Sequence, residues 1–373
     1  MVGISTKLIH GADEVSRVPD VIPPINITTT FKYNDDPNKL VKAADLTSYF
    51  DGDFWYSRLG HPNSEQVEKA IGKIAGGYVV AYSSGLSAFY AAITYFNPKV
   101  LSIGKGYHGC HGIADLHTRN YGLKQISLED DLLKLGKGDL IHLETPVNPE
   151  GTNFDIKYYA DRAHEKGAYL LVDSTLAPPP LQNPFDFGAD MIMHSATKYF
   201  GGHSDLLAGL LITKDASVRE SLLLDRLLLG TNIANLESSL LIRSLKTYEL
   251  RILTQSNNAT KIVKYLVDNI SDFSKLDAVF HGTLQTDGYI KAQVPGGQSP
   301  VFSVKVSTER DARFLPSKLK YFHHATSLGG VESLVEWRAL SDTHADPKLL
   351  RFSVGVENVE DLIEDIATAL RSL

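Results

Sequence analysis

The spacing of hydrophobic positions changes along this chain and predicts where its regular elements lie. The first ~50 residues show little periodicity, and Pro23-Pro24 followed by the polar and β-branched run 25–30 predicts an extended arm. Helical spacing begins near residue 63 and ends at Gly76-Gly77. Its apolar positions are Val67, Ala70, Ile71 and Ile74.

Six short apolar runs follow, each bounded by turns rich in glycine or proline. They occupy residues 79–81, 100–103, 140–143, 169–172, 191–193 and 210–212. Almost continuously apolar strands that alternate with helices are typical of a mostly parallel sheet buried on both faces. The middle of the chain is therefore predicted to be a large α/β domain.

The remainder of the chain predicts a smaller α+β domain. A helical stretch runs from about Leu236 to Asn269 and leaves the large domain. In the final helix, Asn358 is placed to cap an apolar face. That face consists of Val359, Leu362, Ile363, Ile366 and Leu370. We expect an N-terminal arm over 1–60, a large domain over 61–235 and a C-terminal domain over 236–373.

Composition narrows the class of protein. A chain of 373 residues exceeds what one core usually supports, which agrees with two domains. The formal net charge of -7 gives no indication of binding to nucleic acid or to an anionic membrane. The one cysteine, Cys110, cannot form an internal disulfide, and the first residues lack a signal-peptide pattern. We expect a cytoplasmic protein.

Polar residues follow five of the six apolar runs. In an open α/β sheet, ligands bind beyond the carboxyl ends of the strands, so these residues should line one crevice. They are Ser83-Ser84-Gly85-Leu86, Tyr107, Glu144-Thr145-Pro146 with Asn148, Asp173, and His194-Ser195-Ala196-Thr197-Lys198. Together they supply hydroxyls, an amide, carboxylates and an amine.

This set matches the three functional groups of pyridoxal 5'-phosphate (PLP). Lys198 is a candidate Schiff-base nucleophile for the aldehyde, and Asp173 is placed to pair with a protonated ring nitrogen. Ser195 and Thr197 can bind a phosphate through their hydroxyls. The segment 84–86 opens a helix whose free N–H groups favour an anion. The sequence therefore predicts a PLP enzyme.

The stretch 173–205, DSTLAPPPLQNPFDFGADMIMHSATKYFGGHSD, resembles the lysine region of the Cys/Met-metabolism PLP enzymes. That family includes cystathionine γ-synthase, cystathionine β- and γ-lyases, methionine γ-lyase and O-acetylhomoserine sulfhydrylase. Other segments that resemble family motifs, in the family's order, are PPINITTTF, Tyr56-Ser57-Arg58, SSGLSA, ETPVNPEG, RSLKTYELR, TSLGGVESL and LLRFSVGVE. The resemblance covers nearly the whole chain and implies PLP fold type I, the aspartate-aminotransferase-like α/β architecture.

The resemblance also implies a role for each matching residue. Lys198 would hold the cofactor as an imine, Asp173 would bind its pyridine nitrogen, and Tyr107 would stack on its ring. The phosphate would lie against Ser84, Gly85, Leu86, Ser195 and Thr197. The substrate would contact Arg351, Asn148, Ser327 and Thr326. Tyr56 and Arg58 would reach the phosphate of a neighbouring subunit, which implies a dimer with shared sites and the family's usual homotetramer.

The expected activity is a trans-sulfuration reaction of the cystathionine γ-synthase or lyase kind. It would be a β- or γ-elimination or a γ-replacement on sulfur amino acids or O-acylhomoserine. Thr326 stands where related γ-enzymes often carry glutamate, and 335–344 departs from the family's His-Pro-Ala segment. The choice between β- and γ-chemistry, the substrate and the direction of reaction therefore stay open. The alternative is a specialised O-acetylhomoserine γ-substitution with a non-cysteine nucleophile.

Two interpretations of other classes compete with this one. Gly104-x-Gly106-x-x-Gly109, with Glu129 downstream, matches a dinucleotide fingerprint and would indicate a nicotinamide-dependent oxidoreductase. That interpretation leaves Lys198 and Asp173 unexplained. A PLP-binding relic acting as a scaffold would be free to lose such residues, and this chain retains them. The pair His323-His324 lacks further ligand spacing, so we expect no metal site.

Overall fold

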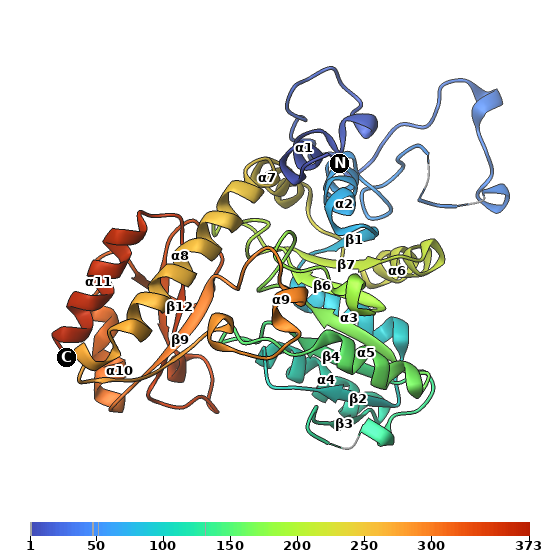
Figure 1. Ribbon diagram of the computed structural model, residues 1–373. Coiled ribbons are helices and arrows are strands. Elements are labelled where there is room, and N and C mark those ends of the chain that lie inside the picture. The colour runs from blue at the N-terminus through green and yellow to red at the C-terminus, as the bar shows by residue number, and fades with distance from the viewer. Residues whose placement is uncertain (1, 47, 51, 131) are drawn as a thin grey trace.

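Two sheets of different size organise the chain (Figure 1). The protein is represented by a computed structural model that describes residues 2–46, 48–50, 52–130 and 132–373. Within these residues the larger sheet has seven strands in the order β1-β7-β6-β5-β4-β2-β3. They are β1 Tyr78–Tyr82, β2 Val100–Ile103, β3 Lys124–Ile126, β4 Leu140–Glu144, β5 Tyr169–Asp173, β6 Met191–Ser195 and β7 Gly209–Thr213. Only β7 runs antiparallel to its neighbours, so the predicted mostly parallel sheet is confirmed.

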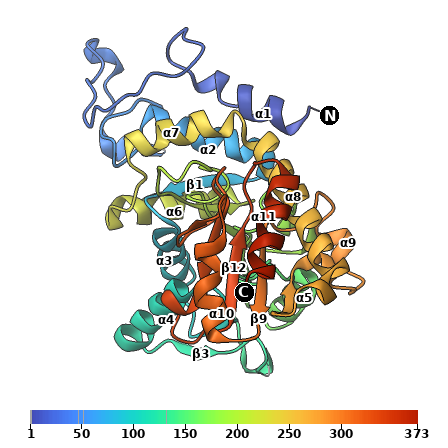
Figure 2. The same ribbon diagram turned by 90° about the vertical axis from the view of Figure 1, so that its left-hand side faces the viewer.

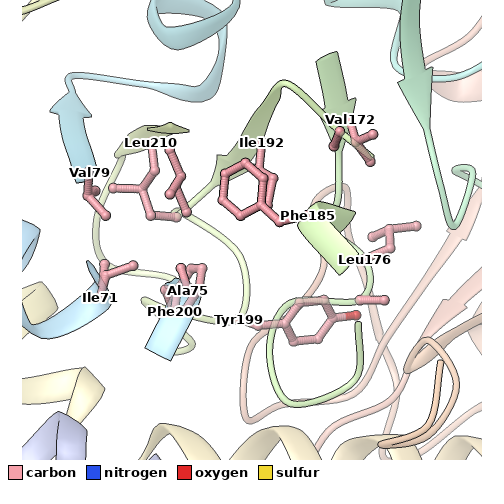
Figure 3. Packing of buried hydrophobic residues seen from close by; sticks show 14 of the residues in the cluster. Ile71, Ala75, Val79, Val172, Leu176, Phe185, Ile192, Tyr199, Phe200 and Leu210 are labelled. Carbon is pink, nitrogen blue, oxygen red and sulfur yellow. The ribbon is translucent and has the colours of Figure 1, made fainter. Parts of the chain in front are cut away.

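Helices cover both faces of this sheet because its strands are apolar on both sides. In β5, Leu170 and Val172 pack into one hydrophobic cluster, and Leu171 packs into another on the opposite face. The first cluster includes α2, α5 and α7, and the second includes α3, α4 and α6. These helices are α2 Pro62–Ala75, α3 Gly85–Phe96, α4 His108–Tyr121, α5 Ile156–Glu165, α6 Ala216–Leu229 and α7 Asn235–Leu245. Figure 3 shows side chains of the first cluster between the strands and α2.

The helical stretch expected over 236–269 is two helices. α7 ends at Leu245, and α8 begins at Tyr248 and continues to Asp268. The buried guanidinium of Arg251 in α8 donates to the carbonyl of Ser244 in α7 at 2.8 Å and so ties the two helices together across the break. The apolar spacing continues across the break, which is why the sequence predicts one helix.

The C-terminal domain has a five-stranded sheet in the order β10-β11-β12-β9-β8. Its strands are β8 Leu276–Phe280, β9 Val301–Val306, β10 His323–His324, β11 Leu334–Trp337 and β12 Leu349–Ser353. The helices of this part are α9 Ile290–Gln293, α10 Glu309–Phe314 and α11 Val359–Arg371. The predicted cap of the last helix is confirmed, because Asn358 Oδ1 accepts from the N–H groups of Glu360 and Asp361.

Helix α8 belongs to both hydrophobic cores and crosses between the two sheets (Figures 1 and 2). Tyr248 and Ile252 pack into the core of the large domain, whereas Ile262 and Leu266 pack into that of the C-terminal domain. The boundary at residue 236 therefore stays a prediction. Within the described ranges, no helix combines the length and the apolar character needed to cross a membrane.

The N-terminal segment begins with α1 Ile4–His10 and then extends away from the body, as Figure 2 shows. Its apolar side chains find little cover in the single chain: Val21 is 97% exposed and Ile27 is 76% exposed. The division of residues 1–60 as a separate N-terminal arm stays a prediction.

Candidate active site

The functional side chains gather where the carboxyl ends of β4, β5 and β6 meet the C-terminal domain. Lys198 follows β6, and its Nζ donates a hydrogen bond of 2.9 Å to the hydroxyl of Ser327. Ser327 lies in the loop between β10 and β11 with φ of 76°, a left-handed conformation unusual for a residue with a side chain. A Cβ added at Gly329 would lie 3.0 Å from the Lys198 carbonyl carbon, so this loop rests directly on the lysine.

The amine of Lys198 is largely removed from water. Burial is the main cause that lowers its pKa, and the positive charge of Arg351 acts in the same direction; together they bring the pKa to about 8, against the opposing effect of Glu336. An amine with this pKa is partly neutral near physiological pH. Lys198 therefore has the property that a Schiff-base nucleophile requires.

Asp173 ends β5 and is buried. Its Oδ1 accepts from the backbone N–H of Thr175 at 2.9 Å and from the hydroxyl of the same residue at 2.6 Å. Burial raises the pKa of this carboxyl, and in the described chain no ion pair involves Asp173. A buried carboxylate without a cationic partner fits a ligand that carries a protonated ring nitrogen.

The start of α3 and the segment after β6 form a place for an anion. Ser84 caps α3 by accepting from the N–H of Ser87 at 3.1 Å. The N–H groups of Gly85 and Leu86, in the first turn, have no partner within the helix. A Cβ added at Gly85 would lie 3.1 Å from the Cβ of Ser195, so the two segments touch. The hydroxyl of Thr197 accepts from the N–H of Ala208 at 3.0 Å. These residues fit the phosphate of the predicted cofactor.

Tyr107 lies at the start of α4 and is 42% exposed. A Cβ added at Gly109 would lie 2.8 Å from Cδ2 of Leu86 and 2.6 Å from Cε1 of Tyr107. The structure thus brings Leu86 and the Tyr107 ring to one place at the helix starts, as a ring-stacking role requires. Of the glycine motif 104–109, Gly109 allows this close approach, whereas Gly104 lies against Leu128.

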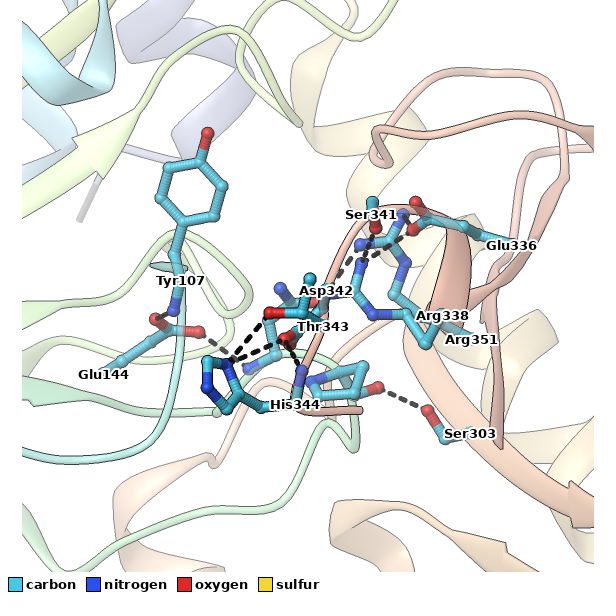
Figure 4. A network of polar contacts seen from close by, with 12 residues as sticks. Tyr107, Glu144, Ser303, Glu336, Arg338, Ser341, Asp342, Thr343, His344 and Arg351 are labelled. Atoms are coloured by element: carbon cyan, nitrogen blue, oxygen red, sulfur yellow. Dashed lines mark hydrogen bonds and ion pairs between the residues drawn. The ribbon is translucent and has the colours of Figure 1, made fainter. Parts of the chain in front are cut away.

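Arg351 connects the C-terminal domain to the end of β4. Its Nη1 donates to Asn148 Oδ1 at 3.1 Å, and its Nη2 donates to the carbonyl of Ser327 at 2.6 Å. The structure thereby brings three predicted substrate residues together beside Lys198. Figure 4 shows Arg351 with its neighbours.

Sequence reasoning gave no role to two buried carboxylates in this region. Glu336 pairs with Arg351 at 2.6 Å and with Arg338 at 2.8 Å, and it holds both guanidinium groups in place. Glu144 accepts from the N–H groups of Tyr107 and Asn148, each at 2.7 Å. The signal for Glu144 was its place at the end of an apolar strand, and that for Glu336 was a charge between apolar neighbours in β11.

Thr326 lies beside an open groove of about 710 Å³. The groove is also lined by Thr197, Ser327, Leu207 and His323. Thr326 therefore shares this groove with two residues of the cluster, Thr197 and Ser327.

Tyr56 and Arg58 lie apart from this cluster. Tyr56 pairs with Thr30 of the arm, and the Arg58 guanidinium donates to the carbonyl of Leu227 at 3.1 Å. Among the described residues, neither side chain hydrogen-bonds to a residue around Lys198. The geometry therefore does not favour a role for Tyr56 and Arg58 in the site of their own chain.

Comparison with known proteins extends over the whole chain. The family model described as Cys/Met metabolism PLP-dependent enzyme matches residues 5–371. The chain is 34% identical to cystathionine gamma-lyase of Saccharomyces cerevisiae, covering 98% of this chain and 97% of that one. It is also 34% identical to cystathionine beta-lyase of Lactococcus lactis, covering 99% of each. The crystal structure of metB from Corynebacterium glutamicum has a TM-score of 0.89 at 29% identity, over 100% of this chain and 98% of that one.

Proposed function

This chain belongs to the Cys/Met metabolism family of PLP-dependent enzymes, and from that premise we propose that the cluster around Lys198 is the active site for its substrates. It is a PLP-dependent trans-sulfuration enzyme with PLP fold type I. The observation that carries the assignment is the low-pKa amine of Lys198, bonded to Ser327 and adjacent to the Arg351–Asn148 pair.

The residues present fit the cofactor. Asp173 would pair with the pyridine nitrogen, Tyr107 would cover the ring, and Lys198 would hold the aldehyde carbon covalently. The phosphate would be held by Ser84, Gly85, Leu86, Ser195 and Thr197. When bound, PLP supplies an electron sink for the negative charge that develops at the substrate's α-carbon.

The chain's own residues bind the substrate and move its protons. The guanidinium of Arg351 and the amide of Asn148 would take the α-carboxylate, for which a planar fork of donors is suited. Lys198 Nζ, once free, would remove the α-proton and return it at a neighbouring carbon. The Ser327 hydroxyl would orient that amine through the bond seen in the structure.

We propose that the substrates are cystathionine-type sulfur amino acids or O-acylhomoserine. The relatives named above are cystathionine lyases of both the β and the γ kind, which supports this class and leaves the choice between the two open. The alternative of a specialised non-cysteine nucleophile gains no support from them. Threonine at 326 favours substrates that do not need a carboxylate at that point.

We also propose assembly into dimers with shared sites, and a homotetramer of such dimers. The exposed Tyr56 and Arg58, and the uncovered arm, support a neighbouring chain as their partner. A cytoplasmic location is proposed from the single buried cysteine, which suits a reducing compartment.

The test of the assignment is covalent trapping. The purified protein should be yellow, and borohydride should fix the cofactor to Lys198. Lys198→Ala should abolish both trapping and turnover. Lys214→Ala is the matched control: it also follows a strand, but β7 runs in the opposite direction, so Lys214 lies at the other edge of the sheet. Normal turnover by Lys198→Ala would refute the assignment.

The substrate class is tested with a panel read by mass spectrometry. It contains cystathionine, cysteine, methionine and O-acetylhomoserine, each with and without added cysteine. We expect turnover of at least one of them to a keto acid, a thiol or a new thioether. If no member of the panel is turned over, the proposed substrate class is wrong.

A separate test concerns the carboxylate site. Arg351→Met should weaken substrate use by about 2–5 kcal/mol and leave the cofactor spectrum intact. Arg251→Met is the control, because Arg251 is another buried guanidinium but donates to backbone carbonyls inside the large domain. Loss of the cofactor spectrum in Arg351→Met would instead mean that Arg351 has a structural role.

A further inference from the structure

We propose that Glu144 is a positioning residue, whose carboxylate fixes together the two loops that present Tyr107 and Asn148 to the reaction. The inference rests on the proposed function, because it concerns the ring-covering tyrosine and the amide of the carboxylate site. Among the described residues, the Glu144 carboxyl accepts hydrogen bonds only from backbone N–H groups, so it acts through its neighbours.

The geometry places one carboxylate between two loops. Glu144 Oε2 accepts from the N–H of Tyr107 and Oε1 accepts from the N–H of Asn148, both at 2.7 Å, as Figure 4 shows for the Tyr107 bond. The loop before α4 rests directly on this side chain, since a Cβ added at Gly106 would collide with the Glu144 carboxylate. Each oxygen therefore holds a different loop.

The link continues to the substrate site. Asn148, whose N–H is held by Glu144, accepts through its side chain from Arg351 at 3.1 Å. A shift of the 145–149 turn would therefore move the partner of Arg351. On the other side, a shift of residue 107 would move the start of α4 and the ring that stands there.

A buried carboxyl is an unfavourable way to end a strand. Burial raises the pKa of Glu144, the neighbouring Asp173 carboxylate acts in the same direction, and the two N–H donors act against them. An apolar residue would avoid this penalty. The two loops give a reason for keeping the carboxylate.

The competing explanation is that Glu144 merely satisfies two buried amides. Asp139, just before the other end of β4, does that for a part of the fold remote from the chemistry. It is buried and accepts from the N–H groups of Lys99, Val100 and Gly136, at 3.1, 2.8 and 2.7 Å. Asp139→Asn is therefore a matched control for Glu144→Gln.

The experiment compares these two variants in two ways. In the cofactor-free protein, hydrogen exchange should speed up at peptides containing residues 107 and 148 in Glu144→Gln, and at those containing 99 and 100 in Asp139→Asn. In the holoenzyme, Glu144→Gln should raise KM about tenfold or more, because an amide can accept at only one of the two positions. Its kcat should change by less than about threefold, and Asp139→Asn should leave KM unchanged.

The outcomes separate the proposals. An unchanged KM in Glu144→Gln, with stability lost as in Asp139→Asn, would overturn the positioning role. If Glu144→Gln does not fold, Glu144→Asp is used: it keeps the charge but withdraws it by one methylene, and an unchanged KM there would also overturn the role. Turnover by Lys198→Ala would overturn the proposed function itself, whatever Glu144 shows.

Discussion

At the scale of the residue, the proposed chemistry depends on the amine of Lys198, which the fold keeps away from water. Because burial and Arg351 lower the pKa of Lys198 to about 8, the neutral fraction of the amine rises as the pH rises through that value. We expect the rate at which the cofactor-free protein captures PLP to rise with pH and to level off above about 8. Stopped-flow absorbance across a pH series measures this rate.

The control for this pH dependence is Arg351→Met. Removing a positive charge near the amine should raise the pKa of Lys198, so the midpoint of the rate profile should move to higher pH. A profile that is flat through pH 8 in the parent protein would contradict the lowered pKa.

Position 326 is expected to influence which substrate is preferred. A carboxylate there could attract the distal ammonium group of cystathionine, whereas the threonine offers only a hydroxyl. Thr326→Glu should therefore shift the ratio of kcat/KM values toward cystathionine and away from O-acetylhomoserine. Thr326→Gln, of the same length without charge, should leave the ratio nearly unchanged. If both variants give the same ratio, charge at this position is not the selector.

Single residues also show where sequence reasoning stopped. Lys198, Asn148 and Arg351 were predicted to act at one site, and the structure brings them together. Glu144 and Glu336 received no role, because what they do is hold other residues in three dimensions. Strand order and side-chain direction decide such contacts, and a motif along the chain does not contain them.

At the scale of the element, α11 depends on its first turn. Asn358 Oδ1 accepts from Glu360 N at 2.9 Å, and Asn358→Ala should lower the free energy of unfolding by about 1 kcal/mol. Asn257→Ala is the control, because Asn257 lies exposed within α8, where alanine should stabilise by a few tenths of a kcal/mol. Urea unfolding of both variants measures the difference, and equal effects would mean that the cap contributes nothing.

The sequence predicted most elements and missed those that depend on tertiary contacts. Apolar runs identified six of the seven strands of the large sheet. The short edge strand β3 has two half-buried residues and one exposed, so its pattern is weak. The break between α7 and α8 is stabilised by Arg251 reaching back to Ser244, a contact that periodicity does not reveal.

At the scale of the whole molecule, the proposed shared sites predict complementation. Arg58→Ala and Lys198→Ala should each be inactive alone. A mixed dimer would contain one site with both defects and one with none, so equal mixing should restore about a quarter of the parent activity. Turnover after verified subunit exchange is the measurement.

The control mixes Lys198→Ala with Asp173→Ala. Both residues are proposed to serve the same chain's site, so every site of a mixed dimer would keep one defect and no activity should return. Recovery in this control, or none in the first mixture, would argue against Arg58 acting on the neighbouring site.

The proposed active site is built from residues of both domains. Asp173 ends β5 and Lys198 follows β6 of the large sheet, whereas Thr326 and Arg351 come from the C-terminal domain. If these residues act as proposed, mutations in the C-terminal domain would alter which amino acid is accepted, while the large domain that would hold the cofactor stays unchanged.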